Sequence, residues 1–128
     1  MHRIILIAVG GYALVNATYI WAAPQHWYNN IPGVPATGPL NLHFVRDVAL
    51  AFLSSALALI WAGGKANATA AICGSLWLAF HALFHLWVWA NRGFPADLVA
   101  LTNLTGIQLP AWVSAWAAIK LHKAEGTS

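Results

Sequence analysis

Charge is what this sequence most lacks. Only 7% of its 128 residues are Asp, Glu, Lys or Arg, whereas about 25% are charged in an average soluble protein. Hydrophobic residues make up 60% of the chain. These few charges cannot cover the surface of a water-soluble globule of this size, so we expect a lipid bilayer to surround much of it. The composition therefore indicates an integral membrane protein.

Cysteine, acidic residues and basic clusters are also scarce, and each absence excludes a class of protein. Cys73 is the single cysteine, which excludes an internal disulfide. Only Asp47, Asp97 and Glu125 are acidic, too few for a carboxylate-bridged di-iron bundle. The formal net charge is +3, but the basic residues are scattered near predicted helix ends, which argues against nucleic-acid binding. The glycine-containing residues 33–38 lack the Lys-Ser/Thr of a phosphate-binding loop.

Long apolar segments dominate what remains. A helix crosses the hydrocarbon core of a membrane with roughly 20 residues. We predict an all-α fold, an antiparallel four-helix bundle that forms a single transmembrane domain over residues 1–128. Its helices are expected at about residues 4–23, 41–62, 68–90 and 97–121. Gly63 and Gly64 are expected to end the second helix, and Pro110 to kink the fourth. The first segment resembles a secretory signal, but Pro24 directly after the would-be cleavage site favours a retained helix.

The segment between the first two predicted helices contains four prolines, which we expect to prevent a regular helix and to form a long loop. Lys and Arg are enriched on the cytoplasmic side of membrane proteins. The end that holds both termini has four basic residues and the opposite end has two, namely Arg3, Lys65, Lys120 and Lys123 against Arg46 and Arg92. We therefore expect cytoplasmic termini and a proline-rich loop on the outer side. The corresponding location is a bacterial inner membrane, with the loop facing the periplasm.

Two pairs of residues spaced four apart make the candidate site, because this spacing places each pair on one face of a helix. The pairs are His43 with Asp47 and His81 with His85. At about 1.5 Å per residue, His85 would lie roughly 9 Å and His81 roughly 15 Å below the outer end of its helix. Ionisable residues at such depth indicate a functional site.

Imidazole and carboxylate groups are suitable ligands for zinc, copper or iron. We predict that a transition-metal ion is bound by His43, Asp47, His81 and His85, with His26 of the loop as an extra ligand. Four further polar side chains fall in the same outer half of the predicted bundle, and we expect them to orient the imidazoles by hydrogen bonding. They are Asn16, Tyr19, Asn103 and Gln108. The resulting function would be metal handling or redox chemistry.

Other interpretations of the same residues stay open. Each histidine could simply hydrogen-bond to a neighbouring helix and stabilise the packing. Histidines from the second and third helices could instead ligate haem b, or tryptophans could form an aromatic wall for a quinone, in an electron-transfer protein. The chain could also be a non-catalytic accessory subunit of a larger membrane complex, or a homo-oligomer. No catalytic residue is identified, so the sequence does not decide whether the protein is an enzyme.

Overall fold

The computed structural model describes residues 1–126, and every regular element in this part of the chain is helical. The predicted all-α class is therefore confirmed. Three helices are long and apolar enough to cross a membrane, which is compatible with an integral membrane protein. They are α1 (His2–Ala22), α3 (Leu42–Lys65) and α4 (Ala68–Asn91).

The last apolar segment is helical throughout but irregular. It consists of α5 (Leu98–Asn103), the π-helical turn η2 (Leu104–Gln108) and α6 (Leu109–Glu125). The final helix thus extends past the predicted end near residue 121, and the last two residues of the predicted domain lie outside the described residues.

Pro110 accounts for the irregularity. Proline has no N–H to donate to the carbonyl oxygen four residues earlier, which here belongs to Gly106. The Tyr12 hydroxyl of α1 donates a hydrogen bond to this oxygen over 2.9 Å. A neighbouring helix therefore satisfies the carbonyl that proline leaves free, as membrane proteins require.

The proline-rich segment is more helical than its sequence predicts. Residues Pro24–Asn30 form the short helix α2, because proline is tolerated in the first turn, where its missing N–H would have no helical partner. The 3-10 turn η1 (Pro35–Thr37) follows. The Tyr28 hydroxyl then donates to the Gly38 carbonyl oxygen over 2.7 Å, which ties the two ends of the loop together. The prediction of an entirely non-helical loop was therefore wrong at its start.

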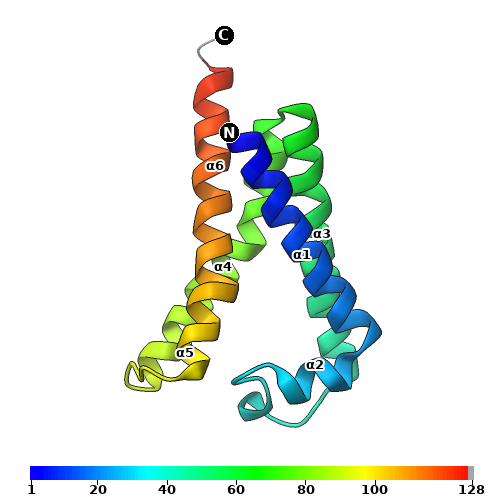
Figure 1. Cartoon of the computed structure of the whole chain (residues 1–128), viewed down its shortest axis with the longest axis vertical. Helices are drawn as coiled ribbons and strands as arrows, with labels where there is room; N and C mark the ends of the chain where they lie inside the picture. Colours follow the sequence, from blue (N-terminus) through cyan, green and yellow to red (C-terminus); the bar gives the residue numbers. More distant parts are fainter. Residues whose placement is uncertain (127–128) are drawn as a thin grey trace.

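The same loop reaches across the molecule to α5. Gly33 has a φ of +91°, and a Cβ atom added there would lie 2.7 Å from Cγ1 of Val99. Only glycine combines this left-handed conformation with so close an approach. Figure 1 shows the loop at the end of the molecule that also holds α5, which we call the loop end; the first residue of α1 lies at the opposite, terminal end.

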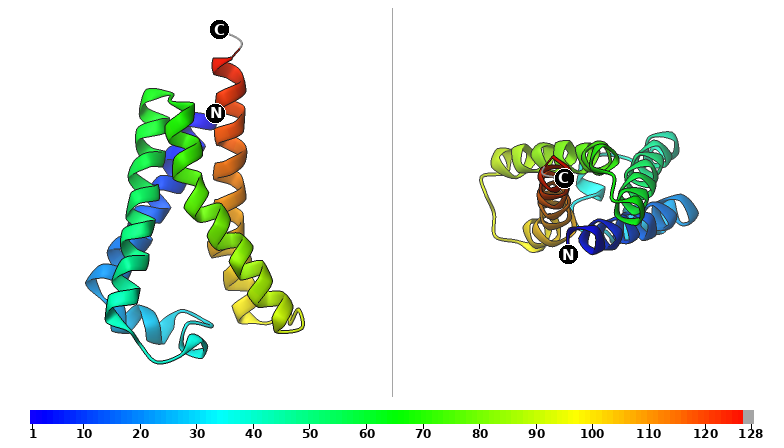
Figure 2. Two further views of the ribbon diagram at one scale, coloured as in Figure 1. Left: turned by 180° about the vertical axis from the view of Figure 1, so that it is seen from behind. Right: turned by 90° about the horizontal axis from the view of Figure 1, so that it is seen from above.

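The helices are packed most closely at the terminal end. Helix α1 lies against α3, α3 against α4, α4 against α6, and α6 against α1. Figures 1 and 2 show that the pair α1–α3 diverges from the pair α4–α6 toward the loop end. Gly10 of α1 permits close packing, because a Cβ there would lie 3.0 Å from the carbonyl oxygen of Ala56.

Helix α3 does not end at its two glycines, as the sequence had suggested. It continues to Lys65, and Ala66 adopts the left-handed capping conformation. Gly63 serves packing instead, because a Cβ there would lie 2.6 Å from the carbonyl oxygen of Arg3. The Arg3 guanidinium donates to the carbonyl oxygens of Gly63 and Gly64, each over 2.8 Å. It thereby satisfies carbonyls that have no partner within the last turn of the helix.

Candidate functional site

His81 and His85 lie side by side on the face of α4 that meets α3. Their ring centroids are 4.6 Å apart, with an interplanar angle of 64°. His81 also stacks on Trp77, at 5.2 Å and 21°, and meets the buried Phe52 of α3 edge-on at 5.6 Å. Both imidazoles are partly buried. The spacing of four residues has therefore produced the adjacent pair that the sequence predicted.

Neither imidazole makes a hydrogen bond within residues 1–126. The indole Nε1 of Trp77, which belongs to the same aromatic cluster, is buried and also has no partner there. A polar group that is removed from water without a hydrogen bond costs free energy. Hydrogen bonding between helices does not explain these two histidines, and their ring nitrogens are available to a ligand.

His43 and Asp47 form a second pair, which is exposed. The distance from His43 Nε2 to Asp47 Oδ2 is 3.4 Å, and the side chains are 90% and 58% exposed. The buried face of α3 passes through Val45 and Ala49. Positions two residues away from these are rotated by about 200° on a helix with 3.6 residues per turn. His43 and Asp47 therefore lie on the opposite side of α3 from its packed face.

The structure does not bring the two pairs together. Among residues 1–126, no three His, Cys, Asp or Glu side chains are close enough to hold a metal ion. The predicted set of four ligands is thus present as two separate pairs in this conformation. The predicted extra ligand, His26, is exposed on α2, and its Nδ1 lies 2.6 Å from the Tyr19 hydroxyl. Asn16 is partly buried on α1 and makes no hydrogen bond to the described residues.

Asn103 and Gln108 bond to each other instead of orienting an imidazole. Gln108 Nε2 donates to Asn103 Oδ1 over 3.0 Å and to the Ala82 carbonyl oxygen of α4 over 2.9 Å. The Trp112 indole donates to Gln108 Oε1 over 2.9 Å. The two amides are five residues apart, and the π-helical turn between them places them on the same face. The result is a buried polar network between α4 and the final helical segment.

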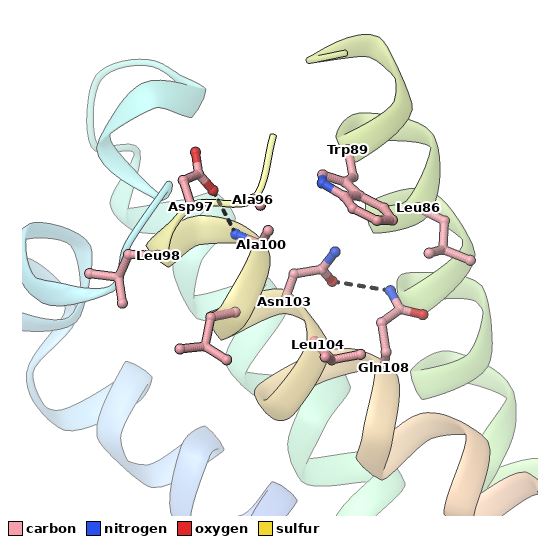
Figure 3. A pocket seen from close by; sticks show the side chains of 10 residues that line it. Leu86, Trp89, Ala96, Asp97, Leu98, Ala100, Asn103, Leu104 and Gln108 are labelled. Atoms are coloured by element: carbon pink, nitrogen blue, oxygen red, sulfur yellow. Dashed lines mark hydrogen bonds between the residues drawn. The ribbon is translucent and has the colours of Figure 1, made fainter. Parts of the chain in front are cut away.

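A largely apolar cleft of about 590 Å³ opens beside this network, between α4 and α5. Figure 3 shows Trp89 and Leu86 on its α4 side, Asn103 and Gln108 at its inner end, and Asp97 near its mouth. Asp97 accepts hydrogen bonds from the backbone N–H of Ala100 and from the Arg92 guanidinium. The Ala100 N–H has the larger effect and the Arg92 guanidinium the smaller; together they hold the pKa of Asp97 below its ordinary value, so this carboxyl is ionised at neutral pH.

Sequence reasoning missed several parts of this arrangement. Trp77 carries a usable signal, since it precedes His81 by four residues and His85 by eight and so shares their face. The contact of His81 with Phe52 could not be predicted from residue spacing, because it depends on which faces of α3 and α4 pack together. The same holds for the cleft between α4 and α5.

The chain was also compared with known proteins. No family model, curated protein or solved structure matches it.

Proposed function

We propose that this chain is an integral membrane protein that binds a transition-metal ion through His81 and His85. One observation carries the proposal: two adjacent imidazoles in an apolar helix have no hydrogen-bond partner among the described residues. Ionisable residues at membrane depth are costly and typically functional. Two histidines spaced four apart on a helix are also a known zinc-binding arrangement.

The two imidazoles supply part of a coordination sphere, and water or a delivered ligand supplies the rest. Imidazole nitrogen suits copper, zinc and iron, which are the ions proposed here. The exposed His43–Asp47 pair lies in the first turns of α3 and is proposed to receive the ion from outside. The proposed function is metal handling at the outer side of a bacterial inner membrane. In this proposal the termini are cytoplasmic, and α1, α3, α4 and the final helical segment form a four-helix bundle.

Metal analysis of the purified, untagged protein tests the proposal. We expect about one ion per chain in the wild type and its loss in the His81→Ala/His85→Ala variant, because the two donors act together. The matched control is His2→Ala/His122→Ala, which removes two histidines at the terminal end and should leave the metal content unchanged.

Two results would count against the proposal. One is a metal content far below one ion per chain in the wild type, or one that the His81→Ala/His85→Ala variant retains. The other is a Soret band in the absorption spectrum, which would assign the histidines to haem b.

A further inference from the structure

The cleft between α4 and α5 is separate from the histidine pair. Its α4 wall includes Leu86 and Trp89. His81 and His85 instead contact each other, and His81 contacts Phe52 of α3. Successive residues of a helix are rotated by about 100°, so positions 85 and 86 face different neighbours. A ligand in the cleft would therefore lie on another side of α4 from the proposed metal ion.

The inner end of the cleft presents a hydrogen-bond donor of fixed orientation. Gln108 Nε2 donates to the Ala82 carbonyl, and Gln108 Oε1 accepts from Trp112, so the orientation of this amide is determined. Gln108 Nε2 also donates to Asn103, which must then turn its oxygen toward Gln108. The Nδ2 group of Asn103 consequently points away from Gln108 and toward Trp89, into the cleft (Figure 3).

Asn103 lacks a partner for this donor. Its side chain is nine-tenths buried, with 9% of the residue exposed. No described residue accepts a hydrogen bond from its Nδ2. Among the described residues, only Trp77 Nε1 is a fully buried side-chain atom without a hydrogen-bond partner, so Asn103 Nδ2 keeps some accessible surface and can donate to a ligand oxygen in the cleft. The cleft is therefore suited to a molecule with a hydrogen-bond acceptor at its buried end.

The charges at the mouth restrict the ligand further. Asp97 is an ionised carboxylate, and Arg92 is engaged in an ion pair with it. The ion pair leaves the mouth without a net positive charge that would attract an anionic phosphate headgroup. The remaining walls are apolar, with leucines at positions 86, 101 and 104. A neutral, lipophilic molecule fits this combination.

We propose that the cleft binds the ring of a neutral lipophilic quinone. One carbonyl oxygen accepts the hydrogen bond from Asn103 Nδ2, and the ring lies against the indole of Trp89. The cleft volume of about 590 Å³ falls in the usual range of small-molecule sites, roughly 300–1,000 Å³. The isoprenoid tail follows the leucines toward the bilayer. A quinone is favoured over an acyl ester because its flat ring complements the indole face.

Binding of decylubiquinone to the full chain in detergent micelles, measured by calorimetry, tests the proposal. Asn103→Leu removes the donor and is expected to weaken binding about fivefold to tenfold, as the loss of one hydrogen bond does. The matched control is Asn16→Leu, the same substitution on α1, which should bind as the wild type does. Ala100→Phe fills the cleft without changing the amide network and should abolish binding.

Three results would overturn the inference. Asn103→Leu could bind as tightly as the wild type, or Ala100→Phe could bind at all. The wild type could also fail to bind the quinone while retaining a phospholipid in the cleft by native mass spectrometry, which would make it a lipid site. His81→Ala/His85→Ala should leave quinone affinity unchanged, so this inference and the metal proposal succeed or fail independently.

Discussion

Gln108→Leu is expected to destabilise the packing of α4 against the final helical segment. The Gln108 amide makes three hydrogen bonds, to the Ala82 carbonyl, to Asn103 and from Trp112. Such bonds in membrane proteins average about 0.6 kcal/mol each, so their combined loss is about 2 kcal/mol. Leucine is close to glutamine in size, and the loss therefore reflects the hydrogen bonds and not a cavity.

The measurement is unfolding of the purified protein in mixed micelles, as SDS is added and helical circular dichroism is recorded. The matched control is Gln25→Leu, because among residues 1–126 the Gln25 amide hydrogen-bonds only to Asn29, within the exposed helix α2. We expect this control to change the unfolding free energy by less than about 0.5 kcal/mol, as surface substitutions usually do. Equal shifts in the two variants, or a Gln108→Leu protein as stable as the wild type, would refute the reasoning.

Two further predictions concern the loop end. Gly33→Ala should destabilise the protein by about 1–3 kcal/mol in the SDS titration, since it places a Cβ in a left-handed conformation. Gly11→Ala is the control, because a Cβ added there would have no atom within 4 Å, and it should show no loss of stability. The contact between Arg92 and Asp97 should be maintained at neutral pH and weaken as pH falls below the ordinary aspartate value of 3.8, because the folded-state pKa is lowered. Trp89 donates to the carbonyl of the nearby residue 95, so the tryptophan fluorescence of the wild type should change with this acid transition, and this change should be absent in Asp97→Asn.

Part of the site could be predicted from residue spacing. The pair His81 and His85 is adjacent because four residues nearly complete a helical turn, whatever surrounds the helix. The pairing of Asn103 with Gln108 could not be predicted in this way, since five residues bring side chains to one face only where a π-turn interrupts the α-helix. The role of Gly63 was likewise misjudged, because a glycine near a helix end and a glycine under a crossing helix look alike in sequence.

The sequence by itself determined the all-helical class, the first three of the four predicted spanning segments, and the adjacency of His81 and His85; the fourth segment is helical but is not among the helices of residues 1–126 that are long and apolar enough to span. Only the tertiary structure decided that His81 lies against Phe52 while His43 is exposed. The physical reason is that lipid tails are as apolar as leucine, so the hydrophobic pattern of a membrane helix does not distinguish its lipid face from its protein face. Which polar side chains meet therefore depends on close packing at positions such as Gly10 and Gly63.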